Sequence, residues 1–219
     1  MFRFVTVQLI SAWFVMTLYS SAVQGHPHNW VTLKSDFILD PQVRLIEIRQ
    51  KWRFDAFYSS ITIADIKNEF SDNNKAGFHH RAKEIITNLE GYQFFSTLKV
   101  NEVEIKLPVP KRYHLNIVEH EDQQILELEM HFVLTKAVDM ENKAVSWSVF
   151  DPTYYISMLY VDLSEFVVLG GNATECSKEL FIPEPSDEAI DYASTLDREQ
   201  RNTEGLGDLF AEQILLNCY

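Results

Sequence analysis

The sequence is poor in cysteine, in positive charge and in long apolar runs. Only two cysteines occur in 219 residues, and 19 lysines and arginines stand against 32 aspartates and glutamates, a formal net charge of −13. This deficit argues against binding of nucleic acid or anionic lipid, because both require a cationic surface. An acidic balance is compatible with the collection of cations, although it more commonly reflects solubility alone.

The sequence also lacks the short motifs of common catalytic sites. It contains no G-x-S-x-G nucleophile elbow, no H-E-x-x-H motif, no phosphate-binding P-loop and no dinucleotide-binding fingerprint. Both cysteines are expected to be bonded to each other and are therefore unsuited to act as nucleophiles. We expect a protein that is not an enzyme, with a periplasmic enzyme of unrecognised class as the alternative.

One long apolar run is present, and it lies at the N-terminus. Arg3 precedes residues 4–19, which are almost free of polar side chains, and small residues follow at 20–22. A basic start, an apolar centre and small residues in that order are typical of a secretory signal peptide. The run is about 16 residues long, whereas a membrane-spanning helix needs roughly 20. We therefore predict a cleaved signal over residues 1–25 and a product located in the periplasm.

Two cleavage positions remain open, one after Ala22 and one after Gly25, and the second would make His26 the first residue. No further long apolar segment follows, so no membrane span is expected after cleavage. Residues 26–219 have the length of a single domain of ordinary size.

The two cysteines, Cys176 and Cys218, lie in the last fifth of the chain. In an oxidising compartment such a pair predicts one disulfide. Closing a loop of this length is credited with about 3–4 kcal/mol in chain-entropy models. The alternative is a metal-binding thiol pair, but zinc sites usually pair cysteines two to four residues apart.

The hydrophobic pattern predicts an α+β fold with mainly antiparallel strands. In residues 43–54, for example, Ile46, Ile48, Trp52 and Phe54 share one parity and charged residues take the other, which is typical of a half-buried strand. Similar patterns predict strands over residues 30–39, 94–100, 103–107, 113–120, 125–133, 144–150, 154–162 and 166–169. A helical insertion is expected over about 60–91, and a helical C-terminal segment over about 186–217, with helices at 186–196 and 206–217.

The hairpin formed by 113–120 and 125–133 allows its register to be predicted. Matching the apolar faces of the two strands, with residues 121–124 as the loop, places His114 opposite His131. Two facing histidines near a carboxylate are able to bind a divalent cation. A solvated polar face is the simpler interpretation.

The segment His26-Pro27-His28-Asn29-Trp30 places two imidazoles near the processed end of the chain. Imidazole is a preferred ligand of zinc, copper and nickel. The amino-terminal copper and nickel chelate needs a backbone N–H that Pro27 lacks. Ligation by both rings, or by the amine and ring of His26 after cleavage at Gly25, remains open, as does a terminus whose histidines have no role.

Two aspartates are further candidates for a metal site. Asp55 follows Trp52-Arg53-Phe54, and Asp151 begins the segment Asp151-Pro152-Thr153-Tyr154-Tyr155 between two expected strands. Each is either a metal ligand or a residue that caps a turn.

Several of these segments together resemble the ZevA-type family of bacterial periplasmic proteins. The resemblance covers nearly the whole mature chain and rests on motifs in a fixed order: His26-Pro27-His28-Asn29-Trp30, Trp52-Arg53-Phe54-Asp55, Gly91-Tyr92-Gln93-Phe94-Phe95, Phe150-Asp151-Pro152-Thr153-Tyr154-Tyr155, and the late cysteine pair. Members of that family are typically encoded beside, or fused to, inner-membrane transporters of the nickel/cobalt type, and the better-studied pairs serve zinc acquisition.

The resemblance implies a periplasmic accessory protein that passes Zn²⁺, or alternatively Ni²⁺, Co²⁺ or Cu²⁺, to such a transporter. His26 and His28 would be its primary ligands, with Asp55, Asp151 or the His114/His131 face completing the site. The rival hypothesis is an acidic docking module for a transporter that has no metal site of its own.

Overall fold

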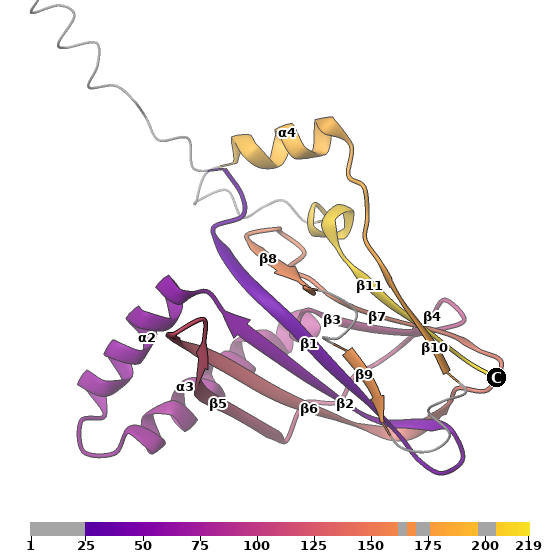
Figure 1. The fold of residues 1–219 in the computed structure, drawn as a ribbon, viewed down its shortest axis with the longest axis horizontal. Coiled ribbons are helices and arrows are strands. Elements are labelled where there is room, and N and C mark those ends of the chain that lie inside the picture. The colour runs from indigo at the N-terminus through magenta and orange to yellow at the C-terminus, as the bar shows by residue number, and fades with distance from the viewer. Residues whose placement is uncertain (1–24, 162–165, 170–175, 197–204) are drawn as a thin grey trace, which may run out of the picture.

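The computed structural model describes residues 25–161, 166–169, 176–196 and 205–219. Its strands form two mostly antiparallel sheets, which confirms the α+β class (Figure 1). The first sheet contains β1 (Asn29–Leu39), β2 (Arg44–Phe54), β5 (Arg112–His120), β6 (Gln123–Asp139), β8 (Ile156–Leu159) and β9 (Phe166–Leu169). The second contains β3 (Ser96–Val100), β4 (Val103–Ile105), β7 (Ala144–Val149), β10 (Cys176–Phe181) and β11 (Gln213–Cys218). Residues 1–24 of the predicted signal peptide lie outside the described residues.

The first sheet has the order β5-β6-β2-β1-β8, with β9 also pairing β1. Neighbouring strands are antiparallel except that β8 and β9 run parallel to β1. One face of this sheet is apolar because alternate residues of each strand point to the same side. Phe37 and Phe132 on that face contact Trp147 of the second sheet, with ring centroids 6.4 and 6.0 Å apart. The main core therefore lies between the two sheets.

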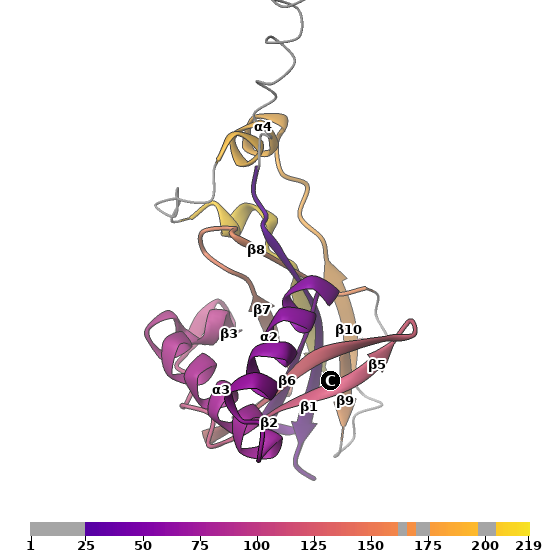
Figure 2. The ribbon, with the colours of Figure 1, turned by 90° about the vertical axis from the view of Figure 1, so that its left-hand side faces the viewer.

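The helical insertion is present and longer than predicted, because it begins directly after β2. It consists of α2 (Ala56–Glu69), α3 (Asn74–Leu89) and the 3-10 segment η1 (Glu90–Phe95). Asp55 and Asn73 cap the two α-helices by accepting hydrogen bonds from backbone amides. The helices cover β5 and β6 on the side facing the core (Figure 2). The opposite face of the first sheet carries most of its charged side chains.

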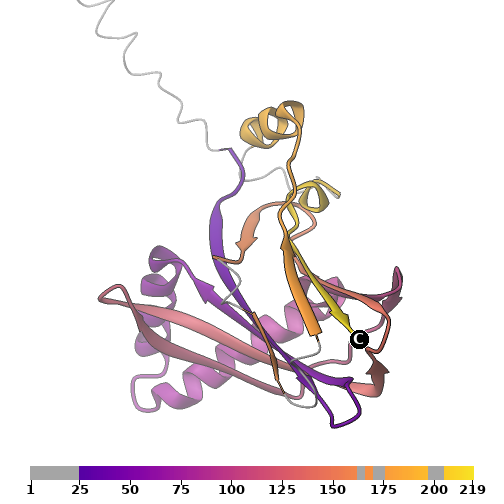
Figure 3. The same ribbon diagram turned by 45° about the vertical axis from the view of Figure 1, so that its right-hand side comes forward.

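The C-terminal part corrects one sequence prediction. Helix α4 (Asp187–Thr195) confirms the helix expected at 186–196, but 206–217 is not helical: a short 3-10 turn, η4 (Gly207–Phe210), leads into strand β11. Figure 3 shows β11, in yellow, beside β10. The apolar residues of this segment fit a helical and an alternating pattern about equally. Pairing with β7 and β10 selects the strand, in which Ile214, Leu216 and Cys218 are buried.

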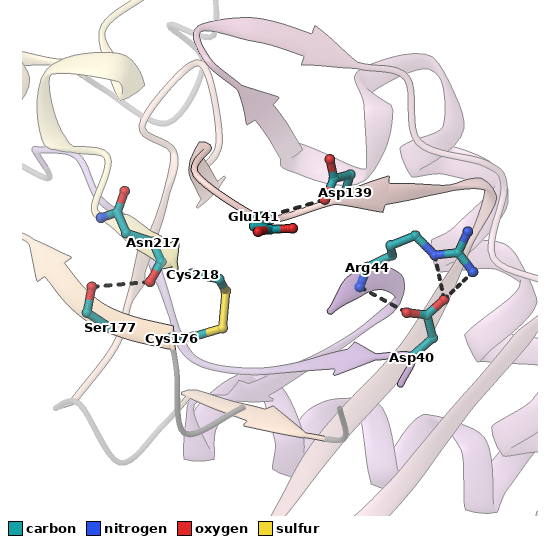
Figure 4. The surroundings of a disulfide bond; sticks show 8 residues. All are labelled: Asp40, Arg44, Asp139, Glu141, Cys176, Ser177, Asn217 and Cys218. Atoms are coloured by element: carbon teal, nitrogen blue, oxygen red, sulfur yellow. Dashed lines mark hydrogen bonds and ion pairs between the residues drawn. A yellow bond between two sulfur atoms is a disulfide. The ribbon is translucent and has the colours of Figure 1, made fainter. Parts of the chain in front are cut away.

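The predicted disulfide is confirmed. Cys176 and Cys218 lie directly opposite each other in register and are bonded, with Cα atoms 4.0 Å apart (Figure 4). The bond ties the edge strand β10 to β11. The nearby β1–β2 turn is held by Asp40, whose carboxylate accepts hydrogen bonds from Arg44 and from the backbone amide of Gln42. These contacts fix the end of the molecule that is remote from α4.

Candidate functional site

The His26–His28 segment immediately precedes β1 in the sequence. In space it lies against the loop that connects β7 with β8. The backbone N–H of His28 donates to the carbonyl of Tyr155 at 2.9 Å, and the parallel pairing of β1 with β8 continues from there. This pairing brings the His-Pro-His motif against the Asp151–Tyr155 motif, although more than a hundred residues separate them in the sequence. Two of the motifs noted in the sequence therefore form one local structure.

Three rings form the centre of this region, which we call the terminal cluster: His26, His28 and Tyr155. The ring centroids of His26 and His28 are 4.9 Å apart, and Tyr155 lies 4.9 Å from His28 and 5.6 Å from His26. His26 is buried, at 7% exposure, and the peptide bond that joins it to Pro27 is cis. Nε2 of His28 is shielded from solvent and has no hydrogen-bond partner within the described residues.

The C-terminal end of α4 closes the terminal cluster from a third side. The backbone N–H of His26 donates to the carbonyl of Ala193 at 2.9 Å. Gly25 approaches so closely that a Cβ atom there would lie 2.5 Å from the carbonyl oxygen of Ser194. Ala193 itself packs in a small apolar cluster, separate from the main core, with Leu196 and Leu206. The position of the two imidazoles thus depends on β1, the β7–β8 loop and α4 together.

Asp151 is buried and supports the loop that carries Tyr155. Its Oδ1 accepts hydrogen bonds from the amide and the hydroxyl of Thr153, at 2.9 and 2.8 Å, and its Oδ2 accepts one from the amide of Ile156 at 3.0 Å. The backbone carbonyl of Asp151 lies against Gly207, where a Cβ atom would come within 1.9 Å. The structure therefore places Asp151 as the residue that shapes the loop, since both of its oxygens already accept hydrogen bonds.

Asp55 also has a role in the local backbone. Its Oδ1 accepts a hydrogen bond from the amide of Tyr58 at 2.8 Å, which caps α2, and its backbone N–H donates to the carbonyl of Trp30 at 3.1 Å. It lines a small cleft with the half-exposed Trp30 and with His120. Within the described residues, no group of three or more His, Cys, Asp or Glu side chains is arranged to hold a metal ion. Neither aspartate therefore joins the two histidines in such a group.

The predicted opposition of His114 and His131 is wrong by two residues. The hairpin turns through Glu121 and Asp122 alone, both with positive φ, so that His114 lies opposite Glu129 and His131 opposite Arg112. Such two-residue turns match the twist of the strands. No Asn-Gly or Asp-Gly dipeptide marks such a turn here, and the same residues of both strands face the core in either register. His114 is exposed and is not a direct cross-strand neighbour of His131.

His131 lies between two carboxylates on the charged face of the first sheet. Its Nδ1 is 2.7 Å from Oε1 of Glu47, and its Nε2 is 3.1 Å from Oε1 of Glu129. Glu47 also accepts hydrogen bonds from Arg49 and Arg112, at 2.8 and 2.9 Å. Burial alone would raise the pKa of Glu47, but the hydrogen bonds from Arg49 and His131 and the nearby guanidinium charges outweigh it and hold the pKa below its usual value.

Glu212 contrasts with Glu47 because it is buried and forms no ion pair with any described residue. Its Oε2 accepts a hydrogen bond from the backbone amide of Tyr160 at 2.7 Å. Desolvation by burial raises the pKa of Glu212, and this hydrogen bond only partly offsets the effect. Burial likewise raises the pKa of the Tyr160 phenol, which shares a hydrogen bond with the Ser35 hydroxyl in the core.

Sequence reasoning did not assign Tyr155, Ala193 or Gly25 to the site. Tyr155 belongs to a motif that supports the family resemblance, and that was the one signal available for it. Ala193 contributes only a backbone carbonyl, and Gly25 only the absence of a side chain, so neither has a local signal in the sequence. In the part of the chain that the structure describes, no helix is long and apolar enough to cross a membrane.

Comparison with known proteins gives two matches over almost the whole chain. Residues 11–218 match the family described as "Protein of unknown function (DUF1007)". An uncharacterized protein of Haemophilus influenzae is 30% identical over 207 residues, which cover 91% of this chain and 94% of that protein.

Proposed function

We propose that this chain, which belongs to the DUF1007 family of proteins of unknown function, is a periplasmic accessory protein in transition-metal uptake. It binds a divalent cation, with Zn²⁺ as the first expectation, through His26 and His28. It then passes the ion to an inner-membrane transporter of the nickel/cobalt type. The assignment to the periplasm rests on the signal-like sequence of residues 1–25. The transporter rests on the resemblance to ZevA-type proteins.

The main support for the proposal is the closeness of the two imidazole rings and the environment of the His28 ring nitrogen. The rings are 4.9 Å apart, and Nε2 of His28 is removed from solvent with no partner within the described residues. A buried polar atom without a hydrogen bond costs about 1–3 kcal/mol. Coordination of a metal ion would offset that cost, since a neutral imidazole nitrogen is the commonest metal ligand in proteins.

Two protein ligands suit a carrier better than a storage or structural site. Structural zinc sites take four protein ligands and release the metal reluctantly. A pair of imidazoles leaves the remaining coordination positions of the ion to water or to ligands of the protein that receives it. The ion is thus free to pass to a protein that supplies more ligands. This role involves no catalytic reaction.

A zinc titration in competition with a chromogenic chelator tests the proposal. We expect His28→Gln and His26→Gln each to weaken zinc binding by at least about tenfold. His114→Gln is the matched control, because it removes an exposed imidazole from another surface, and its affinity should match that of the original protein. Mass spectrometry of the exported protein identifies the first residue, and thereby whether the amine of His26 is available as a further ligand.

An acidic docking module is the second candidate, favoured by the net charge of −13 and by the lack of a three-ligand group in the described part of the chain. It predicts equal zinc affinity for the original protein and both histidine variants. Such a result would exclude the carrier role.

A further inference from the structure

The edge of the first sheet is open beside the last part of β6. Strand β5 pairs with β6 only from His120↔Gln123 to Arg112↔His131, whereas β6 continues to Asp139. On the other side, the pairing with β2 passes from Glu47↔Val133 to Leu45↔Val138. Because the register shifts between Leu45 and Glu47, residues 134–137 form an irregular stretch opposite Ile46, and they have no strand partner on the β5 side within the described chain.

Backbone contacts from the neighbouring loop do not complete this edge. Residues 106–111 connect β4 to β5 and lie beside β6, yet no backbone hydrogen bond joins them to residues 132–137 of the described structure. Unpaired strand amides and carbonyls are a template on which another strand can pair. Proteins commonly protect such edges, and a stretch of edge that receives no backbone hydrogen bonds within the described structure is a candidate for a binding surface.

A cleft of about 520 Å³ lies on this open edge. Its apolar lining includes Val109, Val133 and Leu134, of which the first two are 45% and 51% exposed. The loop residue Pro108 completes the apolar part. A volume of this size accommodates one or two side chains of a bound segment.

The charged part of the cleft is cationic. Lys111 and Arg112 line it, His131 lies at its side, and no carboxylate is among the lining residues. Arg112 uses Nη2 for Glu47 but remains 55% exposed, and Lys111 forms no ion pair within the described residues. In a chain with a net charge of −13, such a surface favours an anionic partner.

We propose that this cleft binds an extended acidic peptide segment of a partner protein by addition of a strand to the open edge of β6. Backbone hydrogen bonds to residues 132–137 would supply affinity. Because side chains alternate along a strand, carboxylates would lie on the face of the sheet that carries Arg112 and His131, while apolar residues lie on the face that carries Leu134. The proposal is independent of metal binding at the terminal cluster.

Three synthetic peptides test this mode of binding by fluorescence anisotropy at about 0.15 M salt, where long-range charge effects are screened. They are fluorescein-labelled (Val-Glu)₄, its (Val-Lys)₄ counterpart, and (Val-Glu)₄ with alternate amides N-methylated. We expect the first to bind at least about tenfold more tightly than either of the others. The first peptide should also shift the NMR amide signals of residues 132–137.

Two charge reversals locate the site. Lys111→Glu should weaken binding of (Val-Glu)₄ by at least about fivefold. Lys83→Glu, the same change at an exposed position of α3, should leave the affinity within about twofold of the original.

The proposal is overturned if none of the peptides binds below about 1 mM, if N-methylation has no effect, or if the two reversals weaken binding equally. Shifts at 132–137 caused by octanoate but not by (Val-Glu)₄ would equally overturn it, by showing a site for small amphiphilic anions.

Discussion

Two histidines of this molecule, His131 and His28, differ in what surrounds their ring nitrogens. His131 lies between Glu47 and Glu129, so that both of its nitrogens are engaged. His28 lies among aromatic rings, and its Nε2 has no partner within the described residues. The availability of an imidazole as a metal ligand is thus decided by its neighbours in space. Two carboxylates lie within hydrogen-bond distance of His131, whereas the terminal cluster offers Nε2 of His28 no competing partner within the described residues.

The two regions also differ in how they are held. The charged face depends on ion pairs between strands that are already joined by backbone hydrogen bonds. The terminal cluster depends on three segments meeting at close range: the start of β1, the β7–β8 loop and the end of α4. Damage to packing should therefore affect the terminal cluster most, and changes in protonation should affect the charged face most.

Gly207→Ala is expected to cause the largest change in the free energy of unfolding. The added Cβ atom would lie 1.9 Å from the carbonyl oxygen of Asp151, so the loop that carries Tyr155 must shift. We expect a loss of about 2–4 kcal/mol in the free energy of unfolding, measured with urea. Gly91→Ala is the matched control, because nothing lies within 4 Å of its added atom. Equal stability of the two variants would refute this account of the loop.

A smaller effect is expected from Glu47→Gln, which removes the charge shared by Arg49, Arg112 and His131. The loss should be about 1 kcal/mol at neutral pH, because solvent at the sheet surface screens the cluster. The pKa of Glu47 is lowered in the folded protein, so its contribution is complete above the unfolded value of 4.5 and is lost as the pH falls through the lowered pKa.

Urea unfolding of both proteins between pH 7 and pH 3 measures this dependence. The difference between the original protein and Glu47→Gln should shrink on acidification. Glu104→Gln, at an exposed position of β4, provides the control, because it removes a charge that forms no ion pair in the described part of the chain. A difference that is independent of pH would show that Glu47 contributes through shape and hydrogen bonds only.

Glu212→Gln is expected to cause the smallest change in the free energy of unfolding, and this change is a gain rather than a loss. Because burial raises the pKa of Glu212, its contribution to stability is complete below the unfolded value of 4.5 and is lost as the pH rises through the raised pKa. The glutamine still accepts the hydrogen bond from Tyr160. We expect a gain on the order of 0.5–1 kcal/mol at pH 7 and no gain at pH 4, measured by urea unfolding. A loss at pH 7 would contradict this assignment.

Much of the fold was accessible from local patterns. The alternation over β2, the helix at α4 and the disulfide were each predicted at or near their observed positions. Each depends on residues that are close in sequence or, for the disulfide, on there being a single pair to form. The candidate site was accessible only in part: His26 and His28 were identified as a pair, but not the contacts with Tyr155 and α4.

The errors share a physical origin. Residues 206–217 fit two periodicities, and the choice of strand was made by β7 and β10, which supply the hydrogen bonds. The register of β5 with β6 depends on a two-residue turn whose positive φ values Glu121 and Asp122 tolerate without a glycine. In both cases local propensity left two solutions with nearly the same burial of apolar residues.

By itself the sequence determined which side chains are available for chemistry, which strand faces are buried, and that two cysteines would pair, because these follow from composition and short-range periodicity. Only the tertiary structure decided that His28 lies without a partner in the described chain while His131 lies between two carboxylates. The reason is that hydrogen bonds and ion pairs act over a few ångströms in space, and the sequence does not state which distant segments come within that range.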